Sequence, residues 1–146
     1  MATTTATITL SSADLLSDNM SLSATMNLYK GGTTATGLEQ MNYHRAIIPT
    51  GVIFDLIPES DALKDNSNYV YIINKNTDPT DYVLIDINTE EIGRLYAGDW
   101  LFMPWSCDIS AAANDSTIEI EAVGHETIIE YALFHIGETL PTASDS

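Results

Sequence analysis

The sequence predicts one all-β domain, a jelly-roll-like antiparallel β-sandwich with an extended N-terminal arm. Three observations favour this fold: apolar and polar residues alternate with period 2 over several segments, turn residues recur at short intervals, and almost no segment has helical periodicity. The 146 residues fit a single domain, here 1–146, and 45% apolar residues can supply its core.

The alternation is clearest over residues 19–28, where every second side chain is apolar and those between are Asn, Ser or Thr. Residues 82–87 and 117–122 follow a similar rule. Such segments are typical of strands with one buried face. The residues that we expect in the core are Met20, Leu22, Met26, Val83, Ile85, Ile118 and Ile120.

Other segments are apolar on both faces, as in residues 69–73, 100–103 and 128–136. A parallel sheet would explain them but needs crossover helices, and only residues 12–17 and 59–64 could form a helical turn. We therefore expect neighbouring subunits to cover the second face, and the chain to form a homo-oligomer, preferably a trimer. Trp100 is expected in the core. The expected interface residues are Ile8, Leu10, Tyr69, Tyr71, Trp105, Tyr131 and Leu133.

The two ends of the chain differ in composition from the middle. Residues 1–10 are rich in Thr and Ala and are predicted to be an arm, whereas residues 141–146 form a polar tail. We expect Ala2 to Leu10 to lie along a neighbouring subunit as an added strand, because their composition suits main-chain pairing with an exposed edge.

Charge excludes one class of partner. Five basic residues against 21 acidic ones give a formal charge of −16, and the basic residues are scattered singly. Binding to nucleic acid needs clustered Lys and Arg, so we expect none. No apolar run reaches the length of a membrane helix, and the start lacks the features of a secretory signal, so we expect no membrane partner and synthesis in the cytoplasm of the producing cell.

Catalytic motifs with matched spacing are missing from the sequence. The three histidines, His44, His125 and His135, include no His-x-His pair of the kind that cupin metal sites use, and no Gly-x-Ser-x-Gly elbow occurs. Cys107 is the single cysteine and has no neighbouring base. We therefore expect no enzyme, no catalytic residue, no metal and no cofactor.

Two binding alternatives stay open. Oxygen ligands for a divalent ion could come from Asp78 and Asp81, and exposed Trp105 with several tyrosines could form a platform for sugars. A second set of oxygen ligands comprises Asp61, Asp65, Asn66 and Asn68.

Two stretches, residues 10–38 and residues 68–76 followed by 91–105, carry a resemblance. They resemble small virion structural proteins of tailed bacteriophages, particularly of marine hosts. The resemblance implies a capsid decoration or cement subunit on the outside of a phage head, which contacts the major capsid protein or other virion proteins. The alternative it implies is a carbohydrate- or receptor-binding sandwich of a tail or fibre.

Overall fold

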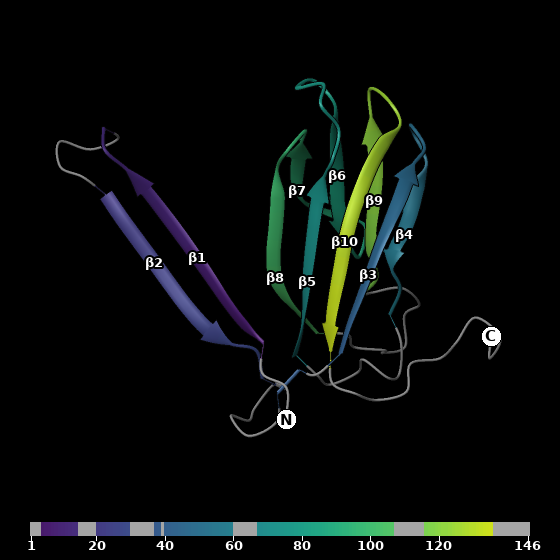
Figure 1. The fold of residues 1–146 in the computed structure, drawn as a ribbon. Helices are drawn as coiled ribbons and strands as arrows, with labels where there is room; N and C mark the ends of the chain where they lie inside the picture. Colours follow the sequence, from purple (N-terminus) through teal and green to yellow (C-terminus); the bar gives the residue numbers. More distant parts are fainter. Residues whose placement is uncertain are drawn as a thin grey trace.

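The computed structural model describes residues 4–14, 20–29, 37–38, 40–59, 67–106 and 116–135, which contain ten strands and no helix (Figure 1). The strands are β1 (Thr5–Ser12), β2 (Met20–Asn27), β3 (Gln40–Ile48), β4 (Ile53–Ile57), β5 (Ser67–Asn74), β6 (Tyr82–Ile87), β7 (Glu90–Tyr96), β8 (Trp100–Ser106), β9 (Ile118–Val123) and β10 (Thr127–His135). Among these described residues there is accordingly no helix that could span a bilayer.

Eight of the strands form two four-stranded antiparallel sheets, ordered β3-β10-β5-β8 and β4-β9-β6-β7. The two sheets stack face to face as the layers of a sandwich (Figure 1). The predicted all-β antiparallel sandwich is thus confirmed. β1 and β2 pair with each other as a separate hairpin, which projects from the sandwich on the side of β8.

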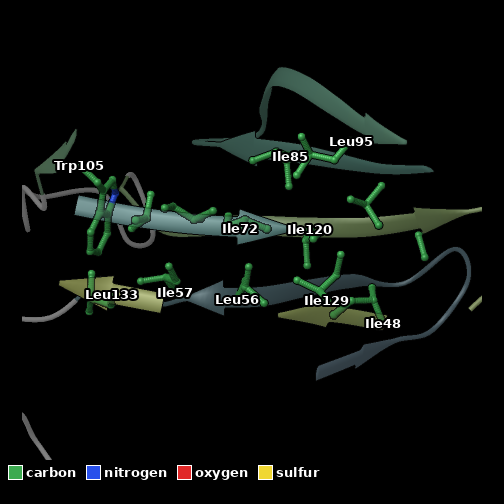
Figure 2. Packing of buried hydrophobic residues seen from close by; sticks show 14 residues of the cluster. Ile48, Leu56, Ile57, Ile72, Ile85, Leu95, Trp105, Ile120, Ile129 and Leu133 are labelled. Atoms are coloured by element: carbon green, nitrogen blue, oxygen red, sulfur yellow. The ribbon is translucent and has the colours of Figure 1, made fainter. Parts of the chain in front are cut away.

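The core lies between the two sheets, where every second side chain of the central strands points inward (Figure 2). Four of the predicted core residues are there, and each is at most 1% exposed: Val83, Ile85, Ile118 and Ile120. They pack with inward residues of the other sheet such as Ile72 and Ile129. Burial of this continuous apolar layer is the main stabilisation of the sandwich.

The prediction of Met20, Leu22 and Met26 as core residues is wrong. These residues lie on β2, whose single neighbour is β1, and Leu22 and Met26 are 56% and 41% exposed. Alternation shows that a strand has one apolar face, but it does not show which surface covers that face.

Two further local features define the sandwich, one at the Asn74 end of β5 and the other at the β6–β7 turn. The buried Asn74 of β5 ties the sheets together, because its side-chain Nδ2 donates to the carbonyl oxygen of Leu95 at 2.9 Å. The β6–β7 connection has positive φ at both Asn88 and Thr89, as a type I′ turn requires. Asn suits this conformation, whereas Thr adopts it at a cost.

The hairpin attaches to the sandwich through a small cluster of its own. The backbone N–H of Leu28 donates to Thr4 O at 2.8 Å, and that of Leu38 donates to Leu28 O at 3.0 Å. Both leucines are buried, and the half-buried residues packed against them are Ala6, Tyr69, Phe102 and Phe134. Residues 5–10 of the expected N-terminal arm are therefore extended, but in this chain they pair with β2 rather than with a neighbour.

Candidate interaction surface

One outer face of the sandwich is apolar. On the β3-β10-β5-β8 sheet, the residues that alternate with the core residues point away from it, as the strand register requires. We call this outer surface the aromatic face. Its residues are Met41, Tyr43, Arg45 and Ile47 on β3, Ile128, Glu130, Ala132 and Phe134 on β10, Tyr69, Tyr71 and Ile73 on β5, and Trp100, Phe102 and Pro104 on β8.

Aromatic rings cover much of this face. Tyr69 stacks on Phe102 with ring centroids 5.5 Å apart, and Phe102 meets Phe134 edge-on at 6.3 Å. Tyr71 lies 6.4 Å from the ring of Trp100, which is 53% exposed. At the edge strand β3, Ile47 is 57% exposed. Contiguous exposed apolar surface of this kind marks interaction sites in proteins.

The charged groups of the aromatic face are confined to one pair. Arg45 and Glu130 are cross-strand partners on β3 and β10, and the hydroxyl of Tyr43 donates to the Glu130 carboxylate. This hydrogen bond, with the neighbouring negative charge, raises the pKa of Tyr43. β5 and β8 carry no charged residue at all, so half of the face is free of charge.

Of the seven predicted interface residues, four lie at the surface and three lie in the interior. Tyr69 and Tyr71 lie half-buried on the aromatic face, and Ile8 and Leu10 are exposed on the hairpin. Three others belong to the chain's own interior and are withdrawn from that set. They are Trp105, Leu133 and the half-buried Tyr131.

The two tryptophans lie in the opposite environments to those predicted: Trp105, expected at the surface, is buried, and Trp100, expected in the core, is exposed. Trp105 is 5% exposed and its indole N–H donates to Ser116 O at 2.9 Å, whereas Trp100 lies on the surface. The prediction of Trp100 as a core residue is therefore wrong, and Trp105 cannot stack on a sugar. Both sets of alternate positions on β8 are apolar, so its composition gave no indication of which set faces inward. For the same reason Ile47 and Phe102 were missed.

The opposite outer face, on the β4-β9-β6-β7 sheet, carries a line of acids. Asp55, Glu119, Asp86 and Glu91 are successive cross-strand partners across all four strands. We call them the carboxylate row. Like charges directly opposite each other destabilise a sheet.

This arrangement perturbs two of the four carboxylates. Partial burial and the charges of Asp55 and Asp86 raise the pKa of Glu119. Partial burial, Glu91 and Glu90 raise the pKa of Asp86 in the same way. Within the described part of the chain, Asp86 Oδ1 is buried without a hydrogen-bond donor, which adds to the cost of its charge.

A second polar cluster joins the loops beside β10. Asp81 is buried, its Oδ1 lies 2.7 Å from His125 Nδ1, and its Oδ2 accepts from Asn76 Nδ2 at 3.2 Å. This pairing raises the pKa of His125. Gly124 next to it has φ +97°, and a Cβ there would come within 3.1 Å of Asp81 Oδ1. The loop is thus built closely around the Asp81 carboxylate.

The ion site that we considered at Asp78 and Asp81 falls in this cluster. Among the described residues, Asp78, Asp81 and His125 are the only His, Cys, Asp or Glu group whose ligand atoms lie within 4.8 Å of one another. Asp78 Oδ1 accepts from the backbone and hydroxyl of Thr80, which lowers its pKa. The Asp81–His125 pair and the hydrogen bonds of Asp78 to Thr80 explain the proximity of these three side chains as stabilisation of the loops. Of the second predicted set, Asn68 is buried in β5, and the other three lie outside the described residues.

The two remaining histidines lie apart from this cluster. His44 is a cross-strand partner of Tyr131, with ring centroids 5.6 Å apart, and His135 is buried at the end of β10. Cys107 lies outside the described residues.

Comparisons with known proteins gave no relatives. No protein-family model matches the chain, and neither a curated protein nor a solved structure is significantly similar to it. Functional inference therefore depends on the surfaces described above.

Proposed function

We propose that this chain is a structural subunit of a virus particle, a capsid decoration or cement protein on the outer surface of a phage head. It forms a homo-oligomer, for which we propose a trimer, and contacts the major capsid protein or other virion proteins. The observation that carries the proposal is the division of the sandwich into one aromatic, nearly uncharged outer face and one acidic outer face.

The aromatic face supports assembly rather than an isolated monomer. Exposed Trp100 lies at one edge of the face and exposed Met41, Tyr43 and Ile47 lie at the other, and its charged residues are the cross-strand neighbours Arg45 and Glu130. Interface cores have this composition, enriched in aromatic side chains and depleted of acids. In a chain of formal charge −16, such a surface is also where two copies repel each other least.

Chain connectivity supports a jelly roll within the sandwich. Successive strands pass from one sheet to the other from β3 to β6 and again from β7 to β10, so that β3 and β10 become neighbours, as do β4 and β9. Eight strands arranged as two Greek keys define a jelly roll, which occurs in viral capsid proteins but also in lectins and cupins. Connectivity therefore favours the proposal only by analogy of fold.

The acidic face supports a place on the outside of the particle. The carboxylate row would be repelled by the phosphates of a packaged genome, whereas solvent hydrates and screens it. The proposed orientation therefore turns this face toward the medium.

Immunolabelling of intact particles tests the proposal. Particles purified by density gradient from the producing cells are probed with an antibody against the chain, and gold label is expected on the outside of the heads. Gold label on the tails instead would contradict the location on the head and show that the chain is a tail protein. If the chain remains with unassembled protein and no particle is labelled, the proposed function is wrong.

A second candidate is a carbohydrate-binding sandwich of a tail or fibre, favoured by the exposed Trp100 beside Tyr71. Aromatic rings of this kind stack on sugar faces, although Trp105, the residue first considered, is buried. A glycan array with the Trp100→Ala variant as control tests it. Binding that requires Trp100 supports it, whereas silence of the array contradicts it.

A further inference from the structure

The β1–β2 hairpin has two chemically opposite faces. Cross-strand pairs alternate between apolar and hydroxyl- or amide-bearing side chains from Thr5–Asn27 to Ser11–Ser21, and the last pair, Ser12–Met20, is mixed. One face presents Ala6, Ile8 and Leu10 of β1 opposite Met26, Ala24 and Leu22 of β2. The other face presents Thr5, Thr7, Thr9 and Ser11 opposite Asn27, Thr25, Ser23 and Ser21.

The apolar face of the hairpin is uncovered in the single chain. Ile8, Leu10, Leu22 and Met26 are between 39% and 56% exposed. An isolated two-stranded hairpin is marginally stable in water and needs a further surface against its apolar side. Cross-strand Thr–Thr contacts such as Thr7–Thr25, at 3.1 Å, add little at an exposed site.

The chain's own sandwich does not provide that surface beyond the point of attachment. Ala6, on the apolar face of the hairpin, packs against the buried Leu28–Leu38 cluster, and so do Tyr69, Phe102 and Phe134 at one end of the aromatic face. From there the hairpin leads away from the sheet, and all residues from 21 to 27 are exposed (Figure 1). The apolar surfaces of hairpin and sheet are therefore continuous, while the far halves of both stay open.

We propose that the apolar face of this hairpin packs on the open part of the aromatic face of a second copy of the chain. This proposal rests on the self-assembly proposed above and names the contact that makes it. The open part comprises Tyr71, Ile73, Trp100, Ile47 and Ile128.

Length and charge both fit this occupant. β1 and β5 are each eight residues long, so the half of the hairpin beyond its attachment and the open half of the aromatic face match in length, at about 13 Å each at the usual rise per residue. β1, β2, β5 and β8 contain no charged residue, so these strands bring no charge into the contact, and the charged groups of the face, Arg45 and Glu130, lie beside Ile47 and Ile128 on β3 and β10. In a chain with 21 acidic residues, four neutral strands are a marked exception.

In a two-fold dimer, each copy would place its hairpin on the aromatic face of the other. In a ring, each copy would place its hairpin on the aromatic face of the next. Since hairpin and aromatic face are different patches of one chain, each copy offers one of each. A ring of three such contacts is closed and leaves neither patch open.

A disulfide-trapping experiment tests the contact in the full-length chain. In a Cys107→Ser background, one version carries Leu22→Cys on the apolar face of the hairpin and another carries Tyr71→Cys on the aromatic face. Mixed and mildly oxidised, the two versions are expected to form a covalent heterodimer. The matched control replaces Leu22→Cys by Ser23→Cys, which points the thiol to the other face of the same hairpin, and is expected to trap at least tenfold less.

Lysine variants give an independent readout. Leu10→Lys with Leu22→Lys places two charges on one apolar cross-strand pair, and is expected to weaken self-association at least tenfold. Thr9→Lys with Ser23→Lys places the same charges on the adjacent polar pair and is expected to leave the oligomer intact. Circular dichroism confirms that each variant retains its strands.

The outcomes separate the two proposals. If the chain is an oligomer but both hairpin variants behave alike and no Leu22–Tyr71 disulfide forms, the hairpin contact is wrong while assembly stands. A monomeric wild-type chain overturns the contact as well. Labelling of particles by antibody does not depend on the hairpin, so the proposed function is judged by its own experiment.

Discussion

The two outer faces of the sandwich are built on the same core and differ in charge, although both carry contacting aromatic rings, Tyr82 and Tyr96 on the acidic one. The β3-β10-β5-β8 sheet presents aromatic rings and one Arg45–Glu130 pair, whereas the β4-β9-β6-β7 sheet presents the carboxylate row. On the first face the neighbouring rings contact each other. On the second, neighbouring carboxylates repel, and two of their pKa values are raised.

This difference in charge would let a strongly acidic chain associate through one face, as we propose. Repulsion between copies is concentrated on one side of the molecule, and the other side is left nearly neutral. Net charge then favours solubility and simultaneously restricts which surfaces of two copies can meet.

The largest expected effect is on the shared core. Ile120 is 1% exposed between the sheets, and Ile120→Ala should lower the free energy of unfolding by about 2–5 kcal/mol through lost burial and a cavity. Chemical denaturation measures it, with Val52→Ala, at a 51% exposed position, as the control expected within about 0.5 kcal/mol of wild type. An effect at Ile120 no larger than at Val52 would contradict this assignment of the core.

The next effect distinguishes the two faces directly. Ile47 and Ile53 are exposed to 57% and 60% on edge strands of opposite sheets. Ile47→Lys should weaken self-association by about 3 kcal/mol or more, because it leaves an unpaired charge in the contact. Ile53→Lys faces Glu121 across the strands and should leave assembly unchanged. Analytical ultracentrifugation compares them, and equal dissociation of both variants would show that the faces do not differ in role.

A smaller effect is expected on the carboxylate row. Glu119 lies between Asp55 and Asp86, so Glu119→Gln removes two unfavourable cross-strand contacts and should raise the free energy of unfolding by about 0.5–1 kcal/mol. Glu126→Gln, in the exposed β9–β10 turn, is the control and should change little. If Glu119→Gln destabilises the chain instead, the repulsion is not significant.

The same row predicts how stability depends on pH. The raised pKa values of Glu119 and Asp86 give stabilisation that is fully present below the ordinary carboxylate pKa of the unfolded chain, and that is lost as pH rises through the raised values. The free energy of unfolding should therefore fall as pH rises above the ordinary carboxylate pKa of about 4, apart from the opposite contribution of Asp78. The double variant Glu119→Gln with Asp86→Asn should flatten this slope, measured by denaturation at several pH values. An unchanged slope would contradict the assignment.

The smallest effect concerns the loop cluster. Hydrogen bonding and charge from Asp81 raise the pKa of His125, and Asp81→Asn should return it toward the ordinary value of histidine. Titration of the imidazole resonances by NMR follows the change, and Asp78→Asn is the milder comparison because its charge contributes less. A His125 titration that is insensitive to Asp81→Asn would mean that the two groups are not paired in solution.

The sequence predicted the fold class and the core of β6 and β9, because on each of these strands one set of alternate positions is uniformly apolar and the other carries at least one acidic residue. It could not orient β8 or β10, whose two sets of alternate positions are both apolar, and so Trp100, Trp105 and Leu133 were misplaced. Orientation there depends on register with strands distant in the chain. The sequence likewise could not show that Met26 lies outside the core. Its strand, β2, forms as the alternation predicts, but it pairs with β1 in a hairpin that no second sheet of the same chain covers.

The central claim is that the aromatic face is a contact between copies and the carboxylate row is solvent-exposed. Size-exclusion chromatography with multi-angle light scattering, performed on the full-length chain at micromolar concentration, tests it most directly. The account predicts a single species whose mass is a small multiple of 15.9 kDa, three copies for the proposed trimer. A stable species of 15.9 kDa would contradict it.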